Sequence, residues 1–543
     1  MNNFLDKLTA NNKLAILFLT GLSLFFFAGL GLVHLFDWDE INFAESAREM
    51  ITTSDYMRVQ INYIPFWEKP PFFFWLQVLS MKLFGINEFA ARFPNALFGL
   101  IYLLTFYFIG KKHFSSKFGM LWALLFFGAL LPHIYFKSGI IDPVFNYFIF
   151  MSLYFLLLVL GKSNEHMNRN ALLSGVFSGL SVLTKGPVGF LLLGLTLLVY
   201  LIIKKFKPFP QLKYILIFFG GFLLVVCSWL CMELYQNGTE NMAKFIEYQL
   251  GLFSSNVAGH EQPFYYHFII VFFGCFPMSL LALPSLRRKT IETPYDLRIW
   301  MLCLFWTVMI VFSITTTKIV HYSSMTYIPL SLLATFFMYG MIEKNKPIRK
   351  SLTATFLIIG VLLGAIFTAL PILLQYKEVL YPYMNDAFAK DSLSTEVLWT
   401  GYELLIGVFF IATVVTAYVF LRRGNLVKGI ITSTMGAAIT LLLVLIFIVP
   451  KIEAFTQGPA IKMYEGLLNE DCYIETRGFK SYAQYFYGNS SIKQKDIEWM
   501  LTSSTIDKPI YLVTKSNNFE LDSYPKFIEI KREGGFKLYK REF

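Results

Sequence analysis

The chain has 543 residues, of which 56% are hydrophobic, 58 are Phe and only 15% are charged. This composition excludes an ordinary soluble domain and is typical of a polytopic membrane protein. The net charge of +11 does not indicate nucleic-acid binding, because the basic residues fall in short loops between apolar segments.

Thirteen apolar segments have a length suited to crossing a bilayer, which takes about 20 helical residues, although two of them are short. The first exceeds the core of a signal peptide, and no A-x-A cleavage site follows it. The segments are 14–36, 93–110, 118–136, 143–160, 171–184, 188–203, 214–232, 266–286, 299–317, 322–342, 351–371, 399–421 and 429–449. The sequence therefore predicts a polytopic α-helical membrane protein with about thirteen transmembrane helices.

Basic residues concentrate in alternate loops, which the positive-inside rule places in the cytoplasm. These loops hold Lys111, Lys112, Lys117, Lys204, Lys205, Lys207, Lys213, Arg287, Arg288, Lys289, Arg298, Lys344, Lys346, Arg349, Lys350, Arg422, Arg423 and Lys428. The N-terminus is then predicted to be cytoplasmic. The first long loop, 37–92, and everything after Pro450 are predicted to face outward.

A cluster of acids follows the first apolar segment, in "LFDWDEINFAESAREM". Its members are Asp37, Asp39, Glu40, Glu45 and Glu49. Apolar residues at helical intervals from Glu40 to Ile51 predict a helix lying along the membrane surface. Asp39 is predicted to cap this helix at the water–lipid boundary. Glu45 and Glu49 are expected to form a solvated or structural face.

Further polar residues collect at the outward ends of the predicted spans. Glu68 and Lys69 lie in "IPFWEKPPFFFW", where a Pro pair restricts the backbone. Asp142 starts the fourth span, and Lys185 lies in "TKGP" between two short spans. The remaining candidates are His260 in "GHEQPFYYH" and Lys318, His321 and Tyr322 in "TTKIVHYSSM".

Each of these residues also has an ordinary structural interpretation. Asp142 before a Pro suits a helix cap, while Lys185 and Lys318 suit snorkelling at the membrane interface. His260 taken alone is more typical of a structural histidine than of a ligand. Together, however, carboxylates, lysines and aromatics on one side of the membrane predict a shared cavity at the outer leaflet.

The chemistry of that cavity narrows the class of ligand. Lysines beside an aromatic, lipid-facing surface suit a lipid that carries a phosphate. Carboxylates suit sugar hydroxyls, a divalent ion or base catalysis. The residues by themselves indicate an enzyme or a transporter of a lipid-linked phosphate compound.

The segment after the last span has a different character. In 450–543 the apolar runs shorten and charges alternate, "PIYLVTK" predicts a strand, and "KFIEIKREGGFKLYK" predicts a hairpin with a Gly-Gly turn. "AIKMYEGLLN" predicts a helix. We therefore expect two domains, a transmembrane domain over 1–449 with a catalytic outer loop at 37–92, and a small extracytoplasmic α/β domain over 450–543.

Several of these stretches resemble one known family. "DWDEINFAESAREMITTSDY", "FWEKPPFFFWLQVLSMKLFG", "ARF", "IDPVFNYF", "LTKGPVGFLL", "PFYYHFIIVFFGCFP" and "TTKIVHYSSMTYIPL" follow in the order found in the C-type membrane glycosyltransferases. The lipid A aminoarabinose transferases and the protein O-mannosyltransferases are the nearest resemblance. It covers about the first 340 residues, and the rest matches only in layout.

The resemblance implies a polyprenyl-phosphate sugar donor, such as an undecaprenyl-phosphate sugar, and no nucleotide cofactor. It implies that Asp39 is the catalytic carboxylate with Glu40 beside it, and that Glu68 and Lys69 lie in the donor-phosphate and metal region. Lys318 and Tyr322 would reach the same phosphate. A divalent metal ion is therefore a candidate cofactor. Asn42 and Phe43 depart from the Arg and Tyr of the aminoarabinose enzymes, which leaves the sugar open.

The function expected from sequence is an inverting glycosyltransferase in the bacterial inner membrane. It would move a sugar from a polyprenyl-phosphate donor to a lipid A-type glycolipid or another cell-surface acceptor on the outer, periplasmic side. Two alternatives stay open at this point. One is protein O-glycosylation with the same donor class, and the other is transport of a lipid-linked sugar, although the chain lacks the repeats and mid-membrane charges typical of transporters.

Overall fold

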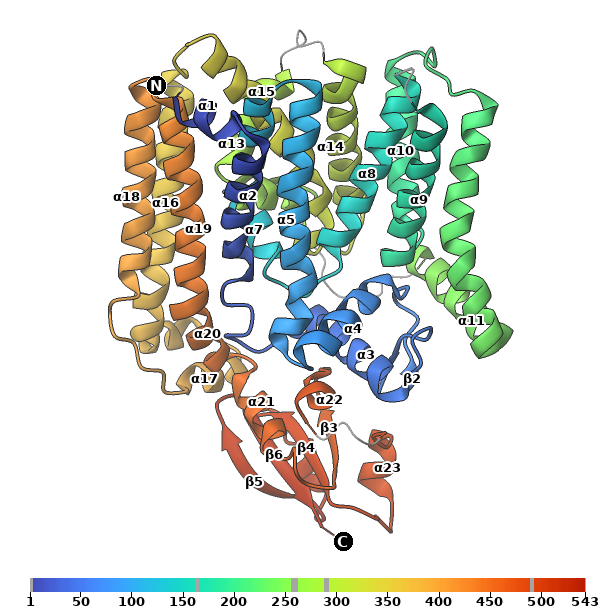
Figure 1. Ribbon diagram of the computed structural model, residues 1–543. Helices are drawn as coiled ribbons and strands as arrows, with labels where there is room; N and C mark the ends of the chain where they lie inside the picture. Colours follow the sequence, from blue (N-terminus) through green and yellow to red (C-terminus); the bar gives the residue numbers. More distant parts are fainter. Residues whose placement is uncertain (1–2, 162–165, 255–261, 288–292, 489–492, 543) are drawn as a thin grey trace.

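The structure is a computed structural model that describes residues 3–161, 166–254, 262–287, 293–488 and 493–542. A helical bundle carries a small α/β domain at one end, and two outer-loop helices lie between them (Figure 1). These two are α3 (Asp39–Thr53) and α4 (Phe72–Phe84), which flank the short strands β1 (Gln60–Ile61) and β2 (Ile64–Pro65).

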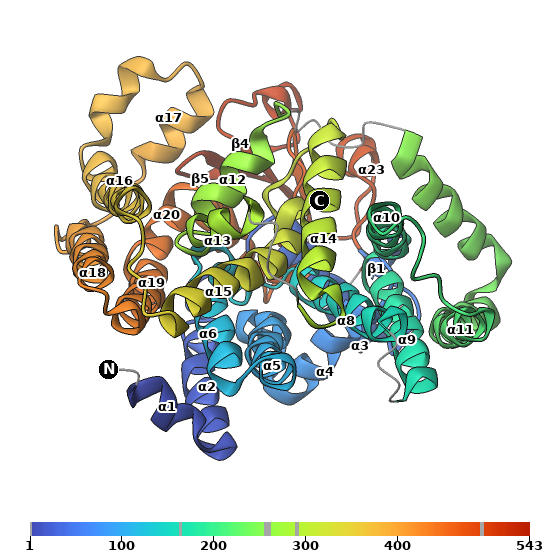
Figure 2. The same cartoon turned by 90° about the horizontal axis from the view of Figure 1, so that it is seen from above.

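The bundle is built from helices whose apolar residues face both neighbours and lipid. They are α1 (Asn3–Thr9), α2 (Asn12–Phe27), α5 (Glu88–His113), α6 (Ser116–Phe127), α7 (Leu130–Tyr135), α8 (Asp142–Leu160), α9 (Met167–Lys185), α10 (Val188–Ile203), α11 (Leu212–Ser254), α12 (Tyr266–Gly274), α13 (Met278–Arg287), α14 (Leu297–Ile314), α15 (Tyr327–Glu343), α16 (Lys350–Gln375), α18 (Leu404–Arg422) and α19 (Leu426–Phe447). Seen from above, α16, α18 and α19 lie at one side and α9, α10 and α11 at the other (Figure 2).

Each predicted span coincides with a helix or a consecutive helix pair. Within the described residues, eight helices are long and apolar enough to cross a membrane, and the pair α12 and α13, bent by 115°, makes up to nine. Four shorter apolar helices, α2, α4, α6 and α10, accompany them. The chain is thus a polytopic helical membrane protein, and the exact count of thirteen stays a prediction.

The loops predicted to be cytoplasmic gather at the end of the bundle that holds the N-terminus (Figure 1). Lys117 forms an ion pair with Asp6 at 2.5 Å, and Lys204 forms one with Asp296 at 2.7 Å. The ring of His113 lies 5.6 Å from that of Tyr295. Basic residues of loops that the sequence assigned to one side of the membrane therefore lie at one end of the bundle, opposite the α/β domain.

Helix α3 differs in two respects from its prediction. Asp39 is not the N-cap: Trp38 holds that position without a side-chain hydrogen bond, and Asp39 is already helical. Glu45 and Glu49 are fully buried and form no solvated face. The apolar spacing located the helix correctly, but it could not reveal that other parts of the outer loop cover the polar side as well.

The C-terminal domain contains a four-stranded sheet in the order β3-β4-β6-β5. Strands β4 (Ile510–Lys515), β5 (Ile528–Glu533) and β6 (Phe536–Arg541) confirm the predicted strand and hairpin. Gly534 in the hairpin turn has φ +54°, a conformation that favours glycine. Strand β3 (Tyr473–Arg477), which pairs in parallel with β4, was not predicted.

Five short helices accompany the sheet within the described residues. Helix α17 (Ala387–Ser394) lies between α16 and α18, α20 (Val449–Phe455) and α21 (Gly458–Glu465) connect the bundle to the sheet, and α22 (Ala483–Tyr487) and α23 (Ile497–Thr502) lie between β3 and β4. The predicted helix at 460–469 corresponds to α21, which begins and ends slightly earlier.

The turn before α3 is held by residues from far along the chain. His34 Nδ1 lies 2.8 Å from Glu453, and the Leu35 N–H donates to the Tyr487 hydroxyl at 2.7 Å. Gln457 accepts from the Asp37 N–H at 3.0 Å and donates to the Leu35 carbonyl at 2.8 Å. The C-terminal domain and its connecting helices therefore fix the backbone just ahead of Asp39.

Candidate active site

A cavity of about 200 Å³ lies at the end of the bundle that faces α3 and the α/β domain (Figure 1). Two carboxylates and two lysines converge on it, against an apolar wall. Its lining residues are Glu68, Lys69, Asp142, Phe145, Asn146, Lys185, Pro187, Val188, Leu192, Phe312, Tyr322 and Met325. The structure thus brings together five of the residues predicted from sequence, which come from four separate stretches of chain.

Asp142 and Lys185 form the buried ion pair of this cavity. Asp142 is the first residue of α8, where the missing N–H of Pro143 costs no helical hydrogen bond. Lys185 ends α9, and Gly186 follows with φ +94°, a backbone conformation suited to glycine. The Lys185 Nζ lies 2.7 Å from Asp142 Oδ1, and both side chains are largely buried.

Asp142 is further held by a hydrogen-bond chain from η2, the 3₁₀ segment Val320–Thr326. Ser324 donates to Asp142 at 3.5 Å, and Asn146 donates to Ser324 at 2.8 Å. With its carboxylate fixed in this way, Asp142 orients Lys185 toward the cavity and does not itself need to contact a ligand.

The same 3₁₀ segment carries Tyr322 to the cavity and places His321 beside Asp39. His321 Nε2 lies 3.6 Å from Asp39 Oδ2, so that α3 and η2 meet at this point. The Tyr322 ring centroid lies 5.6 Å from Lys185 Nζ, within the range of a cation–π contact. The Asp39 side chain remains 33% exposed, which leaves its carboxylate accessible to an acceptor.

Glu68 and Lys69 form the rim of the cavity just before the Pro pair. Their charged groups lie 3.8 Å apart and both side chains stay partly exposed. Among the described residues, no group of three or more His, Cys, Asp or Glu side chains is arranged to hold a metal ion. Binding of a divalent ion near Glu68 therefore stays a prediction.

The other predicted residues that the structure describes do not line this cavity; they are Asp39, Glu40, Lys318 and His321. Lys318 is buried, and its Nζ donates to the Thr315 carbonyl at 2.6 Å. His260 lies outside the described residues. A role for either in phosphate binding stays a prediction.

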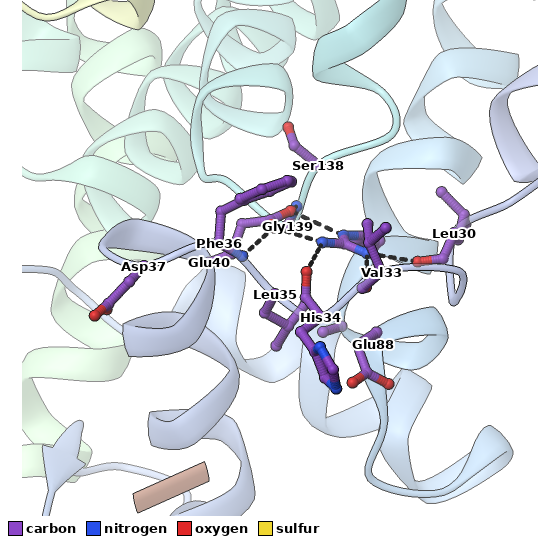
Figure 3. Close-up of polar contacts among 12 residues, drawn as sticks. Leu30, Val33, His34, Leu35, Phe36, Asp37, Glu40, Glu88, Ser138 and Gly139 are labelled. Atoms are coloured by element: carbon purple, nitrogen blue, oxygen red, sulfur yellow. Dashed lines mark hydrogen bonds and ion pairs between the residues drawn. The ribbon is translucent and has the colours of Figure 1, made fainter. Parts of the chain in front are cut away.

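Glu40, unlike Asp39, is buried, and several polar contacts converge on its carboxylate (Figure 3). The Arg92 guanidinium binds both of its oxygens, at 3.0 Å through Nε and 2.8 Å through Nη2. The backbone N–H groups of Phe36, at 2.9 Å, and Gly139 also donate to it. Burial raises the pKa of Glu40, but the charge and hydrogen bonds of Arg92 outweigh it and hold that pKa below its ordinary value.

Arg92 extends this network to the backbone. It donates to the carbonyls of Leu30 and His34 at 2.7 and 2.8 Å, as well as to that of Val33. Glu40 and Arg92 together therefore fix the turn that precedes Asp39. Asp37, in the same turn, points away from Glu40 (Figure 3). Sequence reasoning did not single out Arg92, although it stands in the quoted stretch "ARF".

A second buried charge cluster supports the middle of α3. Arg48 binds both oxygens of Glu45 at 2.7 Å, and Glu49 accepts a hydrogen bond from the Tyr63 N–H at 2.8 Å. Burial, together with the nearby Glu45 charge, raises the pKa of Glu49 to about 8. These two acids therefore stabilise the outer loop and do not reach the cavity.

Comparison with known proteins shows which sequences this chain is similar to. The family model of dolichyl-phosphate-mannose-protein mannosyltransferases matches residues 68–231, which include Glu68, Lys69, Asp142 and Lys185. An undecaprenyl phosphate-α-4-amino-4-deoxy-L-arabinose arabinosyl transferase of Wigglesworthia glossinidia brevipalpis is 26% identical over 342 residues. The resemblance to the C-type glycosyltransferases is confirmed. That match covers 61% of this chain and 59% of the length of the arabinosyl transferase.

Solved structures agree with the C-type glycosyltransferase resemblance at the level of fold. The crystal structure of ArnT from Cupriavidus metallidurans bound to undecaprenyl phosphate matches with a TM-score of 0.76, covers 98% of both chains and is 17% identical. Its apo form matches with a TM-score of 0.75 over 97% of both chains. At this level of identity the likeness establishes the fold alone.

Proposed function

We propose that this protein is an inverting glycosyltransferase that moves a sugar from a polyprenyl-phosphate donor to an acceptor on the outer side of the membrane. The observation that carries the proposal is the placement of Asp39, beside His321, next to a cavity that joins Lys69 and Lys185 to an apolar wall. A polyprenyl phosphate matches both features of this cavity. Its phosphate head carries one or two negative charges, which suit the lysines, and its hydrocarbon chain suits the apolar wall. The named activity of the arabinosyl transferase relatives supports it.

The proposed reaction is a single displacement. The Asp39 carboxylate takes the proton of the acceptor hydroxyl or acid as the acceptor oxygen attacks the anomeric carbon. The bond from that carbon to the phosphate oxygen lies on the opposite face. It breaks as the acceptor oxygen attacks, and its electron pair leaves with the polyprenyl phosphate. Configuration at the anomeric carbon inverts, as in other single-displacement glycosyl chemistry.

Each cavity residue has a part in this scheme. Lys69 and Lys185 stabilise the negative charge of the departing phosphate, and Asp142 orients Lys185. Tyr322 contributes to the same wall, and His321 holds the Asp39 carboxylate in place. Glu40, committed to Arg92, acts as a positioning residue that sets the turn before Asp39 and does not react.

The proposal includes the finer topology. It assigns thirteen spans in the bacterial inner membrane, a cytoplasmic N-terminus, and a periplasmic C-terminal domain over 450–543. The sidedness of Lys and Arg in the sequence supports it. Under this topology Asp39 lies on the periplasmic side, where nucleotide sugars are absent and a lipid-linked donor is required.

The acceptor has two candidates. The resemblance to the lipid A aminoarabinose transferases favours a lipid A-type glycolipid. The family model, whose description is of protein mannosyltransferases, favours a protein hydroxyl. Both fit a carboxylate base that is partly open to the outside, and the sugar itself is left open.

Turnover of an Asp39→Asn variant tests the proposal. Asn preserves the shape of the side chain but removes the basic oxygen, so transfer of sugar from a radiolabelled polyprenyl-phosphate donor should slow by about a hundredfold or more. Binding of the donor lipid should be unchanged. Asp55→Asn is the matched control, since Asp55 lies in the same loop and accepts hydrogen bonds only through an oxygen that Asn retains. Near-normal turnover by Asp39→Asn would exclude it as the base.

A further inference from the structure

One short segment of the C-terminal domain, 479–483, lies between the turn of Asp39 and a second hollow. Its first, third and fifth residues line a cavity of about 510 Å³. Its other two residues face Trp38, the neighbour of Asp39. The Lys480 Nζ lies 4.8 Å from the Trp38 ring centroid, and the Tyr482 ring lies 5.7 Å from it.

Lys480 is held in place by these rings yet remains exposed. Its Nζ lies 5.4 Å from the centroid of Tyr482 in addition to its contact with Trp38, so two aromatic faces orient one ammonium. Tyr482 also contacts Phe66, two residues before Glu68, at 6.5 Å between ring centroids. The C-terminal domain therefore supplies an oriented cation beside Trp38, the residue that precedes Asp39.

The second cavity has a strongly apolar lining. Its walls come from the last turns of the spanning helix α16, from α17, α20 and α21, and from the sheet. They comprise Asp37, Leu370, Leu374, Met384, Phe388, Ala389, Ser392, Leu393, Ile452, Phe455, Thr456, Gln457, Ala460, Ile461, Tyr464, Phe479, Ser481, Ala483 and Phe536. Its volume lies within the range of ligand pockets, and an apolar hollow of this kind suits hydrocarbon.

The cavity also borders the catalytic turn directly. Asp37, one of its few polar lining residues, stands two residues before Asp39, and its N–H is tied to Gln457. Burial raises the pKa of Asp37 to about 6, while hydrogen bonds from Ser481 and the Tyr482 backbone lower it. The segment 479–483 is thus bound to the turn from which Asp39 projects.

We propose that segment 479–483 selects the acceptor, with Lys480 as the specificity-determining residue for an anionic lipid. The Lys480 ammonium binds the anionic headgroup beside Asp39, and the 510 Å³ cavity behind the segment holds hydrocarbon of the same lipid. This rests on the proposed glycosyl transfer and deepens it, because it favours a lipid acceptor over a protein. An anionic lipid offers a charged headgroup to the lysine and hydrocarbon to the apolar cavity. The hydroxyl of a protein acceptor offers neither.

Photolabelling of the purified full-length protein tests the proposal without requiring turnover. The probes are a phosphatidic acid with a diazirine in one acyl chain and the diacylglycerol with the same chains. Phosphatidic acid should label residues of the 510 Å³ cavity at least about tenfold more than diacylglycerol does, since a charge-assisted contact to Lys480 adds to its binding. Lys480→Ala should remove this preference, and Lys480→Arg should retain most of it.

Controls separate this proposal from loss of fold and from the proposed function. Lys526→Ala, an exposed lysine of the same domain, should behave as wild type, and all variants should unfold at the same temperature. Equal labelling by both lipids, or an unchanged preference in Lys480→Ala, would overturn the assignment. So would transfer to peptide hydroxyls that proceeds without a lipid acceptor. Intact lipid preference with no sugar transfer would instead contradict the proposed function alone.

Discussion

The contrast between two adjacent acids gives the sharpest test of the site. Glu40→Gln leaves the buried Arg92 without its counter-charge, although the amide can still accept a hydrogen bond. Removing one partner of a buried pair typically costs about 3–5 kcal/mol. Arg92 would keep its hydrogen bonds to three backbone carbonyls. We therefore expect the free energy of unfolding to decrease by an amount in the lower half of that range.

Denaturant unfolding of purified protein in mixed micelles measures this change. The double variant Glu40→Met and Arg92→Met removes both charges, and a double-mutant cycle should return a favourable coupling of more than about 1 kcal/mol. Asp39→Asn should unfold like wild type while losing turnover. If Glu40→Gln instead retained its stability and lost turnover, Glu40 would be a reacting group and the assignment of roles would be wrong.

Three further outcomes are expected. Lys69→Ala should weaken binding of polyprenyl phosphate about tenfold to a hundredfold, measured by equilibrium binding, and unchanged affinity would remove this lysine from the phosphate site. The Glu49 proton is released near pH 4.5 in the unfolded chain and near pH 8 in the folded protein, so the free energy of unfolding should fall as pH rises between these values. Glu49→Gln should flatten that fall in unfolding curves at pH 5 and pH 8, and an equal slope in both proteins would refute the assigned pKa. In cells whose outer membrane is permeabilised and whose inner membrane is intact, a cysteine at Lys526 should react with a membrane-impermeant thiol reagent and one at Lys346 should not. Labelling of both would contradict the topology.

Local patterns predicted most of the architecture. Apolar length found the helices, and the Gly-Gly turn between alternating residues found the β5–β6 hairpin, because both depend on neighbours in sequence. Strand β3 was missed, since its only partner in the sheet lies more than thirty residues later. The count of spans stays open where helices are short or bent.

The site was predicted in part for the same reason. Lys69, Asp142, Lys185 and Tyr322 each stand in a recognisable local motif at a span end, and the structure brings them to one cavity. Arg92 was overlooked because nothing next to it in sequence indicates that its partner is Glu40. Burial of Glu45 and Glu49 was equally invisible, since it depends on what folds over α3.

The tie between the turn at 34–37 and residues beyond 450 bears on how the enzyme matures in the cell. His34, Leu35 and Asp37 contact Glu453, Tyr487 and Gln457, more than 400 positions later. Under the proposed topology, the first loop is translocated during synthesis, long before those partners leave the ribosome. Asp39 therefore acquires its final setting only after the last domain has crossed the membrane and folded. A chain that ends before residue 450 would keep every cavity lysine but lack the contacts that hold the backbone just ahead of Asp39.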